Sequence, residues 1–256
     1  DEHCRRTSKA SFLDMFDKGE VYQANRPVLW DVDFQTAIAQ AEVEDREMPG
    51  AYHFLRFPVQ DSEEYLVIAT TRPELLPACV AVMVHPDDER YAAYAGKYAV
   101  TPLFHVPVPI IQDVKADPEK GTGVVMVCTF GDQTDVEWWQ EYGLPLRQVL
   151  RADGRLLPLT FAAAGNEDHG WGSLDPDAAN AVYHELAELP AKKAQEKMIA
   201  IAEETPGVID RPREQITHAV KFFEKGYRPL ELLPTRQWYA HLLDKKEALQ
   251  EQGRNI

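Results

Sequence analysis

IATTRPELLPACVAVMVHPDDERY (residues 68–91) and GTGVVMVCTFGDQTDVEWW (residues 121–139) are the two stretches that decide how this chain is organised. Each begins with an apolar run that predicts a buried strand, and each strand ends in a polar cluster and turns into a helix. The polar residues are Thr70, Thr71, Arg72 and Glu74 in the first stretch, and Thr129, Asp132 and Asp135 in the second. Two strand ends with hydroxyls, a guanidinium and carboxylates predict a polar pocket on an apolar scaffold.

The segments around these stretches predict an α+β fold. Alternation at 51–59 and 64–71 is typical of a hairpin, and helical spacing predicts helices at 7–18, from Asp175 onward, and at 191–204. Pro86 and the charged residues after it predict a helix of about two turns that ends at Gly96. Several prolines in 100–115 predict extended edge or loop chain, and 205–213 predict a linker or turn. Strands and helices without a βαβ rhythm favour a small β-barrel core with peripheral helices.

The composition limits the classes of function. The formal charge of −15 argues against broad nucleic-acid binding, because that affinity comes largely from Lys and Arg. The charge leaves open a pocket that accepts only the end of a single strand. No apolar run approaches the roughly 20 residues needed to span a bilayer, and the acidic start DEHC is no signal peptide, so we expect no membrane partner.

The cysteines point to a reducing compartment rather than to disulfides. Cys4, Cys79 and Cys128 are widely spaced and odd in number, so we expect a cytoplasmic protein. The sequence has no CxxC or HxxxH spacing, so we expect neither a metal nor a cofactor. Cys128 stands inside an apolar strand, where a thiol is expected to be inert.

The Asp-x-x-Asp pair has a structural and a functional interpretation. Asp132 is a good N-cap and Asp135 stands near the third helical position, a near-variant of the capping box. The functional interpretation needs one carboxylate to face a cavity and bind an ammonium group. Both can hold, because one acid can cap while the other points outward. Thr70 and Thr71 have a similar alternative, since β-branched residues favour strands.

Both stretches resemble the editing domain, or connective peptide, of class I aminoacyl-tRNA synthetases, in particular of the valyl enzymes. TTRPELLPACVAVMVHPDDERY is similar to the threonine-rich peptide of the valyl branch that carries TTRPELLPACVAV rather than TTRPETLLGDTAV. GTGVVMVCTFGDQTDVEW is similar to the same branch. Isoleucyl enzymes (TTTPWTLPAN) and leucyl enzymes (TTRPDTLFG) fit less well. The flanks RPVLWDVDFQTAIAQAEVED and ITHAVKFFEKGYRPLELLPTRQWY resemble the outgoing and return β-ribbons, so the resemblance covers nearly all residues.

The resemblance implies three parts and the editing-domain fold of the valyl, leucyl and isoleucyl enzymes. We expect an outgoing helix and β-ribbon connector at 1–45, an editing domain at 46–213, and a return ribbon with a terminal helix at 214–256. The HIGH and KMSKS signatures of the catalytic Rossmann half are absent from the sequence, so the chain resembles an editing insertion from a larger synthetase.

Three departures from the family pattern matter. Asp31 and Phe34 stand where many relatives have a cysteine pair, which removes the zinc ligands. Met126 stands where the other valyl branch has a lysine, and Cys79 where it has an aspartate. The roles of that lysine and that aspartate therefore cannot be transferred to this chain.

The implied activity is hydrolysis of the ester bond of mischarged threonyl-tRNA(Val), with the tRNA(Val) 3′ end and the rest of the synthetase as partners. By resemblance, Asp135 binds the α-ammonium group of the threonine and Asp132 lies near its hydroxyl or the attacking water. The implied substrate-binding residues are Thr70, Thr71, Arg72, Glu74, Thr129 and Phe130. Two alternatives stay open: an isoleucyl-type editor that removes valine, and a module that binds the tRNA end without hydrolysis.

Overall fold

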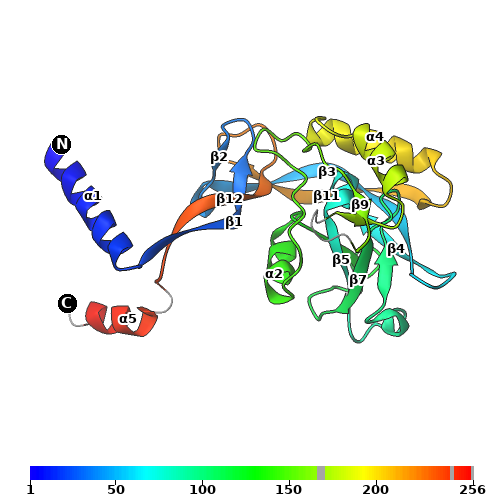
Figure 1. The fold of residues 1–256 in the computed structure, drawn as a ribbon, viewed down its shortest axis with the longest axis horizontal. Coiled ribbons are helices and arrows are strands. Elements are labelled where there is room, and N and C mark those ends of the chain that lie inside the picture. Colours follow the sequence, from blue (N-terminus) through cyan, green and yellow to red (C-terminus); the bar gives the residue numbers. More distant parts are fainter. Residues whose placement is uncertain (166–170, 243–244, 255–256) are drawn as a thin grey trace. The chain divides into compact units, whose positions relative to one another are not determined.

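The computed structural model describes residues 1–165, 171–242 and 245–254 (Figure 1). The chain divides into two compact units. One unit contains Asp1–Val28 and Pro234–Ile256, and the other contains Leu29–Leu233. The candidate functional residues all lie in the second unit.

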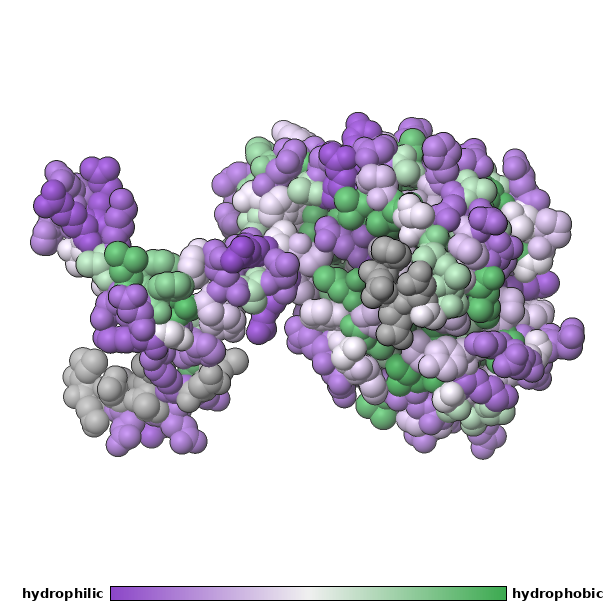
Figure 2. Space-filling model, viewed as in Figure 1, coloured by the Kyte–Doolittle hydropathy of each residue, from purple (hydrophilic) through white to green (hydrophobic). Residues whose placement is uncertain are grey.

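The unit formed by the two ends of the chain contains helix α1 (Glu2–Asp17), helix α5 (Lys246–Arg254) and the terminal parts of two strands. Helix α1 begins earlier than the spacing predicted because the Asp1 side chain caps its first turn. It ends before Gly19, whose φ of 69° is a conformation that favours glycine. The rings of Phe12 and Phe16 stand edge-on to Trp238, with centroids 4.9 and 5.9 Å apart. Figure 2 shows hydrophobic residues, in green, on the surface of this unit.

The strands form four sheets among the described residues. Their orders are β12-β1-β2, β10-β9, β11-β3-β4 and β6-β7-β5-β8. The bounds are β1 Val21–Asp31, β2 Thr36–Ala37, β3 Val43–Pro58, β4 Tyr65–Thr70, β5 Cys79–Val84, β6 Tyr98–Val100, β7 Pro107–Gln112, β8 Val124–Cys128, β9 Ala162–Ala163, β10 Gly172–Ser173, β11 Ile209–Phe223 and β12 Glu231–Ala240. The helices of the unit Leu29–Leu233 are α2 (Gln133–Glu141), α3 (Pro176–His184) and α4 (Ala191–Glu204). The same unit has short 3-10 turns at η1 (Gln40–Glu42), η2 (Pro73–Ala78) and η3 (Ala92–Tyr94).

Strands β3 and β4 form the predicted hairpin, and β11 pairs with β3 along its other edge. The pairing of β3 with β11 runs from Val43 opposite Phe223 to Leu55 opposite Ile209. The expected divisions at 45/46 and 213/214 fall inside these two strands. Residues 205–213 are therefore only partly a turn: β11 already begins at Ile209 and continues through register shifts around Pro212.

Strand β5 is buried on both faces, which explains its continuous apolar sequence. Cys79, Val82 and Val84 belong to the main core, which also contains Tyr183 of α3 and Met198 of α4. On the other face, Val80, Ala81 and Met83 pack with Trp138 of α2. In Figure 1, α3 and α4 lie on one side of this unit and α2 lies near β5. The sheet is thus a closely packed platform for the residues at its strand ends.

Next to this sheet, one sequence prediction is wrong and another is wrong in part. The helix expected after Pro86 is a series of turns and the short η3, because Asp88 and His85 accept hydrogen bonds from nearby backbone N–H groups, which competes with a helix. Residues 101–106 and 113–115 are loop and turn, as expected, but Pro107–Gln112 form β7, which is not an edge strand because it lies between β6 and β5. Proline is tolerated there because only Ile110–Gln112 pair with β5, after both prolines of the strand.

The mixed α and β content agrees with the prediction, but the small β-barrel is not confirmed. The strands of the described residues remain in four separate sheets, and none of these closes on itself. A single bridge, Val59 with Ala99, links the hairpin to the four-stranded sheet. No helix within the described ranges is long and apolar enough to cross a membrane.

Candidate functional site

The two sequence stretches meet at the ends of β4 and β8. Cys79, at the start of β5, lies opposite Cys128, at the end of β8. The backbone N–H of Thr129 donates to the carbonyl of Ala78 at 3.3 Å, and the Cys128 thiol donates to the carbonyl of Leu75 at 3.3 Å. The polar loop after β4 and the polar turn after β8 are therefore neighbours.

The cysteines beneath this junction are protonated groups. Burial raises the pKa of the Cys79 thiol to about 12 and that of the Cys128 thiol well above its usual range. Asp135, Arg72 and Glu74 are all close enough to Cys128 to influence its pKa. The carboxylates and the guanidinium of the two stretches thus share one neighbourhood around an unreactive thiol.

Asp132 and Asp135 form a reciprocal capping box at the start of α2. The Asp132 side chain accepts hydrogen bonds from the backbone N–H groups of Thr134 at 2.8 Å and Asp135 at 3.2 Å. Oδ2 of Asp135 accepts from the backbone N–H groups of Gly131 at 2.8 Å and Asp132 at 3.2 Å. The structural role that the spacing suggested is therefore present.

The two carboxylates differ in exposure and in charge. Asp132 is exposed, whereas Asp135 is only 6% exposed. Burial, reinforced by the nearby negative charge of Asp132, raises the pKa of Asp135 to about 8, against the opposing effect of its backbone hydrogen bonds. Near neutral pH the free chain therefore holds Asp135 mostly as a neutral acid, which a cation placed beside it would ionise.

Arg72 is held between two carboxylates. Its Nε donates to Oε1 of Glu74 at 2.9 Å, and its Nη2 lies 2.8 Å from Oε2 of Glu231. Burial alone would lower the pKa of Arg72, but Glu231 and Glu74 more than offset this effect, so the pKa is raised. Burial also raises the pKa of Glu74 against the pull of Arg72. Arg72 thus stays charged.

The two threonines before Arg72 shape the loop. Oγ1 of Thr70 accepts a hydrogen bond from the backbone N–H of Arg72 at 3.0 Å, which turns the chain out of β4. The carbonyl of Thr71 accepts from Nε2 of Gln195 on α4 at 2.9 Å. Both threonines are half-buried.

Thr129 and Phe130 are packed into the protein. The Thr129 hydroxyl donates to the carbonyl of Arg147 at 3.0 Å and accepts from its backbone N–H at 2.8 Å. Phe130 is 2% exposed and stands edge-on to Trp139, with centroids 5.4 Å apart. Both side chains are therefore buried beside Asp135, and their expected contact with a substrate stays a prediction.

Three residues near the site were not predicted from the sequence: Arg147, Gln195 and Glu231. Arg147 donates from Nη1 to the carbonyl of Cys79 at 2.6 Å and bonds Thr129 through its backbone. Each of the three forms a hydrogen bond or an ion pair with a residue that is distant in the sequence. No local spacing could have signalled them.

Asp31, which stands at the position of the missing cysteine pair, has a structural role in a turn. Oδ1 of Asp31 accepts hydrogen bonds from the backbone N–H groups of Asp33 and Phe34, both at 2.8 Å, and so shapes the turn after β1. Within the described part of the chain, no group of three or more His, Cys, Asp or Glu side chains is arranged to hold a metal ion.

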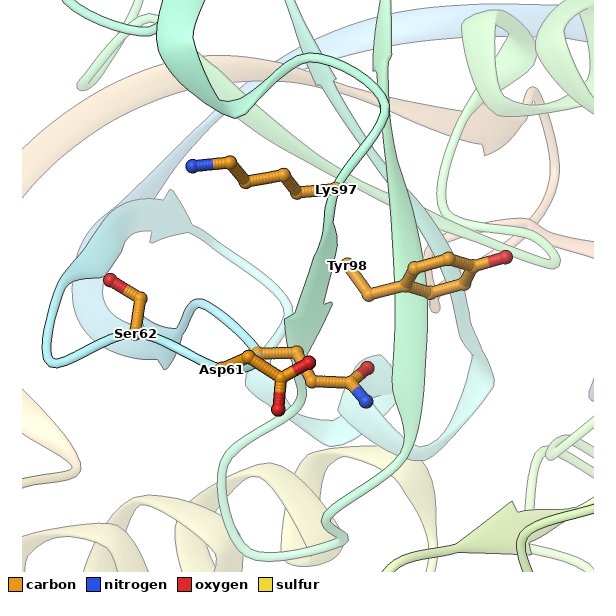
Figure 3. A pocket seen from close by; sticks show the side chains of 5 residues that line it. Asp61, Ser62, Lys97 and Tyr98 are labelled. Atoms are coloured by element: carbon orange, nitrogen blue, oxygen red, sulfur yellow. The ribbon is translucent and has the colours of Figure 1, made fainter.

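A separate hollow of about 410 Å³ lies at the turn between β3 and β4 and the start of β6. Figure 3 shows its lining side chains, which come from Gln60, Asp61, Ser62, Lys97 and Tyr98. None of these is a predicted site residue. The hollow therefore has no part in the site at the ends of β4 and β8.

Comparison with known proteins places this chain in a family. The model of the tRNA synthetases class I (I, L, M and V) matches residues 1–256. The chain is 46% identical over 260 residues to a valine–tRNA ligase of Thermobifida fusca, covering 100% of this chain and 28% of that protein. It is 45% identical to the valine–tRNA ligase of Salinispora tropica, covering 100% and 29%. The chain thus spans less than a third of the length of these relatives.

Among solved structures, the chain is similar to a LeuRS of Agrobacterium radiobacter K84 in a ternary complex with tRNA. The TM-score is 0.41 at 18% identity, over 82% of this chain and 31% of that chain. This likeness is too distant to support an inference. The family model covers every residue of the chain, including both stretches that meet at the site. The chain therefore belongs to the class I tRNA synthetases of the isoleucyl, leucyl, methionyl and valyl group.

Proposed function

We propose that this chain is an editing hydrolase, an aminoacyl-tRNA deacylase that cleaves the ester bond of threonyl-tRNA(Val). It would act as part of a valine–tRNA ligase, with the rest of that synthetase and the tRNA(Val) 3′ end as partners. The observation that carries the proposal is the meeting of the Thr70–Glu74 loop with the Asp132–Asp135 turn around Cys128. We also propose the editing-domain fold of the valyl, leucyl and isoleucyl enzymes.

The need for such an activity follows from the shapes of the two amino acids. Threonine is nearly isosteric with valine, and the apolar pocket of the valyl enzymes rejects it by only about 100-fold. A second pocket that hydrogen-bonds a hydroxyl would bind threonine in preference to valine, because valine would leave buried polar groups unpaired. The carboxylates at the start of α2 are suitable partners for that hydroxyl.

In the proposed reaction the attacking group is water. The Cys128 thiol is protonated and the Thr129 hydroxyl is bonded to Arg147, so neither is an activated nucleophile. Water adds to the ester carbonyl carbon, the bond to the ribose oxygen breaks, and that oxygen takes a proton. Threonine and tRNA leave as products. We propose that the exposed Asp132 orients the water or the threonine hydroxyl, with help from the free ribose hydroxyl of the substrate.

Asp135 has the role of binding the α-ammonium group. An ammonium beside this buried acid favours its ionised form and gives a charge-assisted hydrogen bond. Because the pKa of Asp135 in the free chain is about 8, ionisation at neutral pH is uphill until the cation arrives. We propose that Thr70, Thr71 and Arg72 face the ribose and terminal adenosine, with Glu74 supporting Arg72.

One observation favours a second candidate, a module that binds the tRNA end without hydrolysis. Both acids of the Asp-x-x-Asp pair already accept hydrogen bonds from backbone N–H groups at the start of α2, as a purely structural pair would. An isoleucyl-type editor would need a pocket too apolar to satisfy a hydroxyl. Exposed Asp132 beside the site argues against such a pocket.

The test is a single-turnover deacylation assay with the chain in excess over threonyl-tRNA(Val) or valyl-tRNA(Val). Spontaneous ester hydrolysis in buffer is the background to subtract. We expect the threonyl ester to be hydrolysed roughly 5- to 150-fold faster, since each unpaired buried polar group costs about 1–3 kcal/mol. Equal rates contradict the hydroxyl-reading pocket. Saturable binding with no hydrolysis would establish the binding module instead.

A further inference from the structure

The first residues of β12 touch both halves of the candidate site. Glu231 approaches Arg72 of the loop after β4, with Nη2 and Oε2 2.8 Å apart. The next residue, Leu232, packs against Phe130 and Val136 of the turn and helix after β8. One strand start therefore braces the two segments whose meeting defines the site.

The ion pair of Glu231 is protected from water. The side chains of Glu231 and Glu74 are 10% and 4% exposed, while that of Arg72 is 27% exposed. Oε2 of Glu231 makes no hydrogen bond of good geometry within the described residues, so its link to Arg72 is an ion pair rather than a well-aligned hydrogen bond. A buried pair of this kind is weakly screened by salt and restricts where the guanidinium can lie.

The two carboxylates leave one part of the guanidinium uncommitted. Nε of Arg72 donates to Glu74, and Nη2 forms the ion pair with Glu231. Nη1 has no hydrogen-bond partner among the described residues. The planar guanidinium has a fixed arrangement of donors, so holding two nitrogens fixes the direction in which the third one points. Arg72 is the most exposed member of the cluster, so its guanidinium is the group of the three that a ligand can best reach.

We propose that Glu231 is a positioning residue that acts through Arg72. It fixes the guanidinium so that Nη1 is ready for the polar oxygens of the nucleotide at the tRNA end. This inference rests on the proposed function and adds a role for a residue outside both motif stretches. It also means that the chain entering β12 helps to set the affinity of the site.

The proposal predicts an effect on substrate binding that passes through Arg72. Arg72 is proposed to contact the nucleotide, which is unchanged during hydrolysis, so its orientation matters equally before and in the transition state. Glu231→Gln keeps the shape and an accepting oxygen but weakens the grip, because a neutral amide holds a guanidinium less well than a carboxylate does. The KM for threonyl-tRNA(Val) should rise about tenfold with kcat changed less than twofold.

The experiment is a double-mutant cycle with Glu231→Gln and Arg72→Lys, measured by steady-state deacylation of threonyl-tRNA(Val). Lysine keeps the charge but lacks the fixed third donor. In the Arg72→Lys background, Glu231→Gln should raise KM less than twofold. The matched control is Glu214→Gln, which changes the net charge equally at an exposed position of β11 and should leave KM unchanged.

Three outcomes overturn the positioning role while the wild-type chain is active: an unchanged KM in Glu231→Gln, the same tenfold effect in both backgrounds, or a loss confined to kcat. If Glu231→Gln does not fold at the assay temperature, as judged by circular dichroism, Glu231→Asp replaces it. Aspartate keeps the charge with a shorter reach, and the same dependence on Arg72 is expected. A wild-type chain that hydrolyses no aminoacyl-tRNA overturns the proposed function itself, which distinguishes the two failures.

Discussion

The two strand ends that meet at the site use their polar side chains differently. After β4, Arg72 pairs with Glu74 and with Glu231 of a distant strand. After β8, Asp132 and Asp135 bond backbone N–H groups within four residues of themselves. The first arrangement depends on the tertiary fold and leaves a guanidinium nitrogen uncommitted. The second forms locally and places Asp135, which is mostly protonated near neutral pH, beside the exposed carboxylate of Asp132. In the proposed function, the first arrangement binds the nucleotide and the second binds the amino acid.

The largest stability effect is expected at the end of β4. Arg72→Ala leaves two buried carboxylates without their cation, and breaking a buried ion pair by removing one partner costs about 3–5 kcal/mol. Urea unfolding followed by circular dichroism measures this loss. The control is Arg228→Ala, which removes an exposed pair with Asp33 and should cost at most about 1 kcal/mol. Equal costs for the two variants would mean that the Arg72 cluster is not a tertiary clamp.

The end of β8 should give a distinctive dependence of stability on pH. The pKa of Asp135 rises on folding from 3.8 to about 8, so between these values the folded chain holds a proton that the unfolded chain has lost. Its stabilising contribution is complete below pH 3.8 and is lost as the pH rises to about 8, by at most about 1.4 kcal/mol per pH unit.

The measurement is urea unfolding at several pH values between 5 and 8 for the wild type and for Asp135→Asn. The raised pKa of Glu74 adds a slope of the same sign, so the difference between the two proteins is the quantity of interest. The wild type should lose stability more steeply than the variant. Identical slopes would show that Asp135 is ionised in the folded chain.

A smaller effect is expected from removing the exposed cap. Asp132→Ala should destabilise the chain by about 1 kcal/mol, because two backbone N–H groups at the start of α2 lose their acceptor. Asp175→Ala is the matched control, since Asp175 caps α3 and is not a candidate site residue. Both should lower the unfolding midpoint similarly, and only Asp132→Ala should slow deacylation. Equal deacylation rates for the two variants would mean that Asp132 acts only as a helix cap.

The local features of this comparison could be predicted from the sequence, and the long-range ones could not. Helix α4 occupies the predicted residues 191–204, and the Asp-x-x-Asp spacing indicated the capping box before its hydrogen bonds were known. Both depend on neighbours three or four residues apart. The pair of Arg72 with Glu231 depends on how strands stack, and many of the chain's acidic residues looked equally suitable. The hydrogen bond of Thr129 to Arg147 likewise joins segments that are separate in the sequence, so no spacing around Thr129 indicates it.

The central claim is that Asp135 binds the ammonium group of the substrate in addition to closing a capping box. Asp135→Asn keeps the shape and an oxygen that can accept from Gly131, and it removes the charge. A hydrogen bond to a charged group is worth about 1.5–3 kcal/mol, so deacylation of threonyl-tRNA(Val) should slow by roughly 10- to 150-fold in a folded variant. Asp175→Asn, the same change at the cap of α3, should hydrolyse at the wild-type rate. Near-normal hydrolysis by folded Asp135→Asn would contradict the account and leave Asp135 as a helix cap alone.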